Sequence, residues 1–160
     1  MTQPGSAWAH VRWATAALVA LMMVSISGCD QTGAERDRRV VVEQQAIVQY
    51  SAKVPDADRH QGAFANEWRK INELKELKAY KAGMATKVLP ALETYVAVLK
   101  MMPAETGDLK RIHGLMTAGY DDAVVAFKAF LADLDDSNVE AKYRALLEAM
   151  EKVSHAERRY

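Results

Sequence analysis

The sequence predicts an all-α protein, an up-down helical bundle of four or five helices that follows a cleaved signal peptide. Apolar residues recur at steps of three and four over most of the chain from residue 64 to residue 153, as in amphipathic helices. Eight glycines and four prolines are too few for the frequent turns of an all-β chain. Hydrophobic residues make up 50% of the sequence, a share that can fill a core and that is too high for intrinsic disorder.

The first helix is expected to run from about Glu35 to Lys53. Its main apolar residues are expected on one side of the helix, and they are Val40, Val41, Ile47 and Val48. Pro55 and the polar run that continues to Gly62 are expected to end this helix, because proline disrupts a helix interior.

Residues 64–102 continue the helical pattern, with Phe64 and Trp68 on the apolar face at its start. One helix over this range would be about 58 Å long at about 1.5 Å per residue, which is long for a domain of this size. Gly83 and Pro90 are the two candidate breaks, because glycine weakens a helix and proline removes a backbone donor. The sequence leaves the choice between them open.

Two further helices complete the predicted bundle. Helical spacing runs from Leu109 to Leu134, and the polar residues 135–138 predict the turn after it. Ser137 and Glu140 match a capping box, in which each side chain would bond to a backbone amide at the start of the last helix.

The N-terminal segment is typical of an export signal. Arg12 is the only charged side chain before Asp30, and the apolar stretch from Trp13 to Ile26 has fourteen residues. A helix that spans a bilayer needs about twenty residues, so the stretch fits the apolar region of a secretory signal peptide instead. The segment ends in an aliphatic residue, two small residues and a cysteine, Ile26-Ser27-Gly28-Cys29.

This tetrapeptide resembles the lipobox of bacterial lipoproteins. The resemblance implies a diacylglyceryl thioether on Cys29, cleavage just before it, and acylation of the new amino group, for example with palmitate. It divides the chain into a signal peptide (1–28), a lipidated cysteine with a tether (29–34) and a helical bundle domain (35–160). By the same resemblance Asp30, directly after the cysteine, favours retention in the inner membrane on its periplasmic face. Cys29 is the only cysteine, so no internal disulfide can form.

Charge and motif content exclude several functions. Lysine plus arginine total 21 and aspartate plus glutamate total 21, whereas a nucleic-acid binder needs a marked basic excess. The sequence contains no glycine-rich phosphate loop, no G-x-S-x-G and no H-E-x-x-H. We therefore expect neither a nucleic-acid partner nor an enzymatic activity.

One histidine and three methionines are candidate metal ligands. His113 lies near the apolar stripe of its predicted helix, three residues before Met116, while Met101 and Met102 end the preceding helix. Imidazole and thioether donors suit Cu(I). In the alternative interpretation the methionines fill gaps in the core near a turn, and His113 bridges core and solvent.

A second possible chelating group precedes residue 64. Asp56, Asp58 and His60 carry donors for a divalent ion, although such residues more often serve as turn residues or helix caps.

The C-terminal part contains Arg111-Ile112-His113-Gly114, then Asp121-Asp122-Ala123, and His155 five residues from the end. These residues are similar to those of the helical-bundle b-type cytochromes of the bacterial periplasm. The resemblance implies haem held between a methionine of the first helix and His155. However, no methionine occurs between Asp30 and Gly83, and His155 is expected to face solvent as an i,i+4 neighbour of Glu151.

Together these features predict a protein of the bacterial cell envelope that is anchored in the lipid bilayer by acyl chains. Its bundle is expected to act as a non-catalytic interaction or accessory module, and its partner would be another envelope protein met in the plane of the membrane. No resident cofactor is expected. The alternative is a periplasmic bundle that binds copper or haem.

Overall fold

The computed structural model describes residues 33–132 and 134–158, and these residues form helices and connecting turns without any strand. The elements in chain order are α2 (Gly33–Ser51), α3 (Val54–Asn72), α4 (Leu77–Gly83), η2 (Met84–Val88), α5 (Leu89–Lys100), α6 (Gly107–Leu131) and α7 (Val139–Arg158). The prediction of an all-α fold is confirmed.

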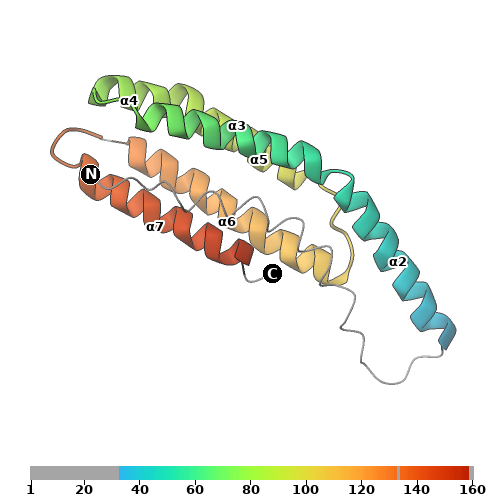
Figure 1. Cartoon of the computed structure of the whole chain (residues 1–160). Helices are drawn as coiled ribbons and strands as arrows, with labels where there is room; N and C mark the ends of the chain where they lie inside the picture. The colour runs from blue at the N-terminus through green and yellow to red at the C-terminus, as the bar shows by residue number, and fades with distance from the viewer. Residues whose placement is uncertain (1–32, 133, 159–160) are drawn as a thin grey trace.

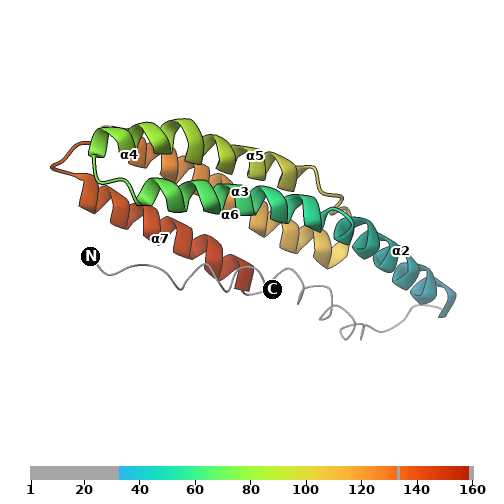
Figure 2. The ribbon, with the colours of Figure 1, turned by 45° about the horizontal axis from the view of Figure 1, so that its top comes forward.

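Two antiparallel hairpins form the bundle (Figure 1). In the first, α3 packs against the continuous run of α4, η2 and α5, and in the second α6 packs against α7. Contacts between α5 and α6 join the hairpins. The bundle thus has four helical segments that run alternately up and down, namely α3, the run from α4 to α5, α6 and α7. The helix α2 projects beyond one end of this four-segment bundle, as both Figure 1 and Figure 2 show.

Aromatic side chains fill the space between the two hairpins. Phe127 of α6 makes edge contacts with Phe64 and Trp68 of α3, at ring-centroid distances of 5.9 and 5.0 Å. Tyr95 of α5 and Tyr120 of α6 make a similar contact at 4.9 Å. All five rings are buried, which confirms the prediction that Phe64 and Trp68 belong to the core. Such rings bury large apolar areas and dominate the energetics of a core.

The prediction that Pro55 and residues 56–62 end a helix is wrong. The helix α2 ends earlier, at Ser51, and Pro55 lies in the first turn of α3. The first turn of a helix leaves its amides unpaired, so proline loses no hydrogen bond there. Asp56, also in that turn, interacts favourably with the positive end of the helix dipole.

Neither Gly83 nor Pro90 divides residues 64–102, so both candidate breaks are wrong. The chain reverses at residues 73–76, between the end of α3 and the start of α4, and is helical from Leu77 to Lys100. Just before Pro90 the helix widens into η2, where the amide of Leu89 bonds to the carbonyl of Met84, five residues back. The wider turn relieves the clash that a proline ring makes with the carbonyl four residues before it.

Gly83 has a packing role instead. A Cβ atom at this position would lie 2.5 Å from Cδ1 of Ile71, so the absence of a side chain lets α4 approach α3 closely. This contact lies next to the reversal at residues 73–76 and helps to close the first hairpin.

The turn before α7 differs from the predicted capping box. Ser137 donates from both its hydroxyl and its amide to Asp135 Oδ1, at 2.6 and 2.9 Å, and the Asn138 amide donates to the same oxygen. Glu140 pairs with Arg144 on the solvent side of α7. Asp135, two residues earlier than the predicted capping residue, therefore organises this turn because its carboxylate accepts three hydrogen bonds.

Candidate functional site

The predicted lipidation site lies outside the described residues. Cys29, the lipobox, Asp30 and the apolar stretch from Trp13 to Ile26 all precede Gly33, where α2 begins. Along the chain Gly33 follows Cys29 by four residues. The first described element is thus a helix that starts close to the predicted anchor in sequence.

One side of α2 contacts the bundle. Glu43 Oε2 accepts a hydrogen bond of 2.8 Å from the hydroxyl of Thr106, and the hydroxyl of Tyr50 lies 3.1 Å from Nδ1 of His113. Thr106 directly precedes α6, so the Glu43 carboxylate meets the positive end of the α6 dipole. These two contacts fix the position of α2 against the N-terminal end of α6.

The first residue of α6 is adapted to this contact. Gly107 has a φ of +32°, in the region that favours glycine, and a Cβ atom there would lie 2.6 Å from Glu43 Oε1. Neither Glu43 nor Tyr50 was predicted as a site residue from sequence. A sequence signal was nevertheless available, because at helical spacing Glu43 and Tyr50 fall on the same face as the apolar residues Val40 and Ile47. A carboxylate on a face that packs against the bundle is partly removed from water and therefore needs a hydrogen-bond partner.

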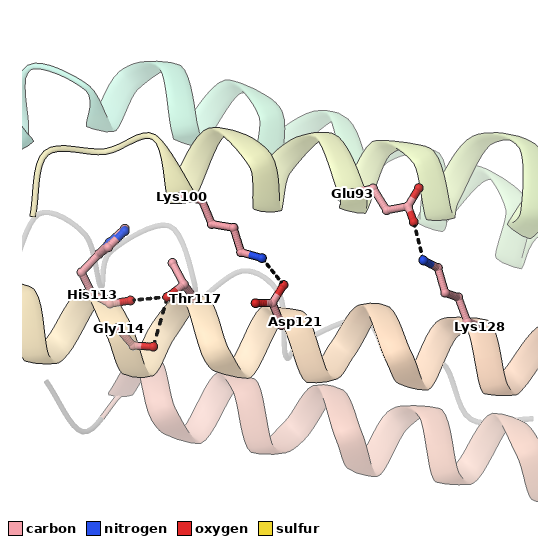
Figure 3. Close-up of polar contacts among 7 residues, drawn as sticks. All are labelled: Glu93, Lys100, His113, Gly114, Thr117, Asp121 and Lys128. Carbon is pink, nitrogen blue, oxygen red and sulfur yellow. Dashed lines mark hydrogen bonds and ion pairs between the residues drawn. The ribbon is translucent and has the colours of Figure 1, made fainter.

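His113 is buried between α2, α5 and α6, with 8% of its surface exposed. The Tyr50 ring stands edge-on to the imidazole at 5.5 Å between centroids. In Figure 3 the imidazole extends from α6 toward the layer that contains α5. Burial lowers the pKa of His113, and a hydrogen bond with the Leu99 backbone opposes this effect only in part. Burial likewise raises the pKa of Tyr50 to about 12, so its hydroxyl stays protonated at neutral pH.

The three candidate methionines lie in different environments. Met101 is 83% exposed, Met102 is buried in the core, and Met116 is half-buried against that core. The side chain of Met101 therefore points away from the interior in which His113 and Met102 lie. For His113 to bind Cu(I), one of its ring nitrogens would have to give up its present hydrogen bond.

Asp56, Asp58 and His60 lie in the first turns of α3 rather than in a linker. Asp56 Oδ1 pairs with Arg59 at 2.5 Å and lies 3.8 Å from Nε2 of His60. In the described part of the chain, no group of three or more histidine, cysteine, aspartate or glutamate side chains is placed to hold a metal ion.

The interior of the bundle bears on the resemblance to b-type cytochromes. Phe64, Trp68 and Phe127 occupy the space between α3 and α6. The side chain of His155, the histidine that the resemblance offered as a haem ligand, lies outside the described part of the structure. The resemblance therefore stays a prediction.

Ion pairs span the outer edge between α5 and α6 (Figure 3). Lys100 pairs with Asp121 at 2.7 Å, and Glu93 with Lys128 at 2.8 Å. All four side chains are substantially exposed to solvent, so each pair contributes at most about 1 kcal/mol. One turn before Asp121, the hydroxyl of Thr117 donates to the carbonyls of His113 and Gly114 within α6.

One segment on the side of α2 that faces away from the bundle is uncharged. It consists of Val41, Gln44, Gln45, Val48 and Gln49, which line a shallow surface hollow, and we call it the outward face. Val41 is 50% exposed and Val48 is 68% exposed, whereas Val40 and Ile47 are half-buried. The prediction that these four residues share one side is therefore wrong, because the two pairs lie about 100° apart around the helix axis.

No family model, curated protein or solved structure matches the chain. Within residues 33–132 and 134–158, no helix combines the length and the hydropathy that crossing a bilayer requires.

Proposed function

We propose that the protein is a lipoprotein of the bacterial cell envelope, anchored through Cys29 on the periplasmic face of the inner membrane. Its helical bundle serves as a non-catalytic interaction or accessory module. The observation that carries the proposal is the sequence Ile26-Ser27-Gly28-Cys29, which places the only cysteine directly after an apolar stretch of signal-peptide length.

The position of α2 supports an anchored arrangement. An extended chain spans at most about 3.6 Å per residue, so the four steps from Cys29 to Gly33 reach no more than about 14 Å. The first turn of α2 would thus stay close to the membrane, and the bundle would stand on the far side of α2. Several acyl chains at about 0.8 kcal/mol per buried methylene make such an anchor stable.

Exposed apolar side chains support an interaction role. Val41 and Val48 lie on the outward face of α2, and Leu115 and Val125 lie on the solvent side of α6. A contiguous exposed apolar patch marks a surface that contacts another protein, and Val41 and Val48, two turns apart on one helix face, are the candidate members of such a patch. A partner in the same membrane is met at a raised effective concentration, so modest surfaces are enough.

Metabolic labelling tests the anchor. Cells that express the full chain are grown with radiolabelled palmitate, and their membranes are separated from soluble protein. The wild-type chain is expected to carry label and to sediment with membranes, and Cys29→Ser is expected to lose both properties. The matched control Gln31→Ser lies outside the lipobox and is expected to behave as wild type. Equal labelling of Cys29→Ser and wild type would refute the proposal.

Copper binding is a second candidate function, and the observation that favours it is the burial of His113 near the C-terminal end of α5, which Met101 and Met102 follow. If it holds, Cu(I) raises the melting temperature of the detergent-solubilised protein, and His113→Ala abolishes the rise. Haem, the other ligand of this alternative, is tested by the same titration. Absence of a shift with either ligand would exclude this function.

A further inference from the structure

The helix α2 is held to the bundle by a small contact. Its residues 33 and 35–39 are exposed, and none of the α2 residues whose burial is described is fully buried. The helices α3, α5, α6 and α7 instead each contribute several fully buried side chains to the core. An element with few buried contacts opens at a lower free energy than the whole protein unfolds. We therefore expect α2 to leave the bundle more easily than any of these four helices.

The connection between α2 and α3 is suited to such a movement. Only Ala52 and Lys53 separate the two helices. The Lys53 amide donates to the carbonyl of Tyr50 in α2, and the Lys53 carbonyl accepts from the amide of Asp56 in α3. Pro55 has no amide with which to continue the hydrogen bonds of α2 into α3. Rotation about the backbone of residues 52 and 53 therefore turns α2 and leaves the two helices themselves intact.

We propose that α2 is a pH-dependent arm, which docks on α6 at neutral pH and is released, by rotation at Ala52 and Lys53, when His113 takes up a proton in mild acid. The inference goes beyond the proposed function and does not depend on the lipid anchor.

The hydrogen bonds of His113 match the neutral ring. A neutral imidazole has one donor and one acceptor. The Tyr50 hydroxyl lies 3.1 Å from Nδ1, and because burial raises the pKa of Tyr50 to about 12, this hydroxyl keeps its proton and donates it. The bond between the ring and the Leu99 backbone favours the protonated form, so the imidazole is its donor. A second proton, on Nδ1, removes the acceptor that Tyr50 of α2 uses.

A proton on His113 also meets no opposite charge in the docked form. On α2, the Glu43 carboxylate accepts from Thr106. On α5, Lys100 pairs with Asp121 of α6 at 2.7 Å.

The charges nearest to His113 along α6 also belong to an ion pair, in which Arg111 and Asp108 lie 3.1 Å apart on the exposed surface. In the part of the chain that the structure describes, no ion pair includes His113, and burial is the main cause of its lowered pKa. The docked form therefore disfavours the charged imidazole.

The sign of the pH dependence follows from this difference. Release of α2 removes one of the three helices that bury the imidazole, so the pKa of His113 rises toward its ordinary value of about 6.5. The released form then binds the proton more tightly, and acid favours it. Docking is complete above about pH 6.5, and by pH 5.5 its equilibrium constant is expected to fall several-fold, by up to about tenfold.

Amide hydrogen exchange of the detergent-solubilised full chain tests the proposal. Exchange is measured at pH 7.5 and pH 5.5 in peptides that cover residues 40–51 of α2 and residues 113–127 of α6. Each rate is divided by the rate of an unfolded peptide at the same pH, which removes the intrinsic effect of pH on exchange. The protection of α2 is expected to fall several-fold at pH 5.5, while that of α6 changes much less.

Three variants identify the group that takes up the proton. His113→Gln keeps a donor and an acceptor but does not titrate, so the protection of α2 is expected to be the same at both pH values. His60→Gln is the matched control, because it removes a histidine of α3 that lies beside Asp56, and it is expected to respond as wild type. Glu43→Gln removes the charge at the other contact, so α2 is expected to be less protected at both pH values but to keep the response.

Three results would overturn the inference. The first is equal protection of α2 in the wild type at both pH values. The second is an equal loss of protection in α2 and α6, which would show unfolding of the whole bundle instead of release of the arm. The third is a response that persists in His113→Gln or disappears in Glu43→Gln, since the proton would then act at a different group. Palmitate labelling through Cys29 is measured separately, so loss of the label would refute the anchor and leave this inference standing.

Discussion

At the scale of single residues, Phe127 packs the second hairpin against the first. It is fully buried on α6 and contacts Phe64 and Trp68 of α3. Phe127→Ala is expected to lower the free energy of unfolding by about 3–5 kcal/mol, because it leaves a cavity that the rigid neighbours cannot fill. Urea denaturation followed by circular dichroism measures the change.

The control for this prediction lies two residues away. Val125 is on the exposed side of the same helix, and Val125→Ala is expected to change stability by no more than about 0.5 kcal/mol. If both variants lost the same amount, the location of the core described above would be contradicted.

His113 predicts a pH dependence of stability. Burial lowers its pKa in the folded protein below the ordinary value of about 6.5, so the unfolded chain binds more protons in mild acid. The contribution of neutral His113 to stability is therefore complete above about pH 6.5, and it is lost progressively as the pH falls from there toward the folded-state pKa.

Denaturation at several pH values checks this dependence. The free energy of unfolding of the wild type is expected to fall between about pH 7.5 and pH 5.5, and His113→Gln is expected to flatten that decline because it removes the titrating group. Parallel pH profiles for the two proteins would show that His113 does not titrate in the predicted way.

At the scale of helices, two glycine-to-alanine substitutions test whether the close contact between α4 and α3 stabilises the first hairpin. Gly83→Ala is expected to destabilise the protein by about 1–3 kcal/mol, because the added methyl group would overlap Ile71. Gly62→Ala, in the exposed part of α3, has no atom within 4 Å of the added carbon. It is expected to stabilise the protein by about 0.5–1 kcal/mol through helix propensity alone. Thermal unfolding of both variants gives the comparison, and the same sign of change in both would contradict it.

The attachment of α2 to the bundle is a second test at this scale. Tyr50→Phe keeps the ring contact with His113 and removes the hydroxyl that bonds to Nδ1. The free energy that holds α2 in place is expected to fall by about 0.5–1.5 kcal/mol, the usual value of one hydrogen bond. Hydrogen exchange of amides in α2 measures this loss. Gln49→Ala, on the outward face, is expected to leave the exchange rates of residues 43–47 nearly unchanged.

The helical elements also show where local reasoning failed. The positions of α6 and α7 follow from the three-four spacing of their apolar residues, which is a local property. The reversal at residues 73–76 has no such signal, because Glu73, Leu74, Lys75 and Glu76 include neither glycine nor proline. It forms where α4 folds back on α3, and that return depends on the contact between Gly83 and Ile71, twelve residues apart.

At the scale of the whole molecule, we propose that an anchor and a bundle have separate roles. In this proposal the anchor confines the chain to a membrane, α2 connects it to the bundle, and the bundle provides the surface that a partner contacts. The outward face of α2 is the part of this arrangement that the sequence alone concealed. From the sequence, Val40, Val41, Ile47 and Val48 are expected on one side, whereas in the structure Val40 and Ile47 are half-buried and Val41 and Val48 are exposed.

The sequence by itself determined the helical class, the turn regions after residues 102 and 134, the core positions of Phe64 and Trp68, and the prediction that Cys29 is lipidated. These features depend on neighbours within about one helical turn or on a short motif. Only the tertiary structure decided that Pro90 stays inside a helix, that Glu43 and Tyr50 hold α2 to α6, and that His113 is buried. Each of these depends on residues distant along the chain, because packing between helices selects among conformations that local preferences leave nearly equal in free energy.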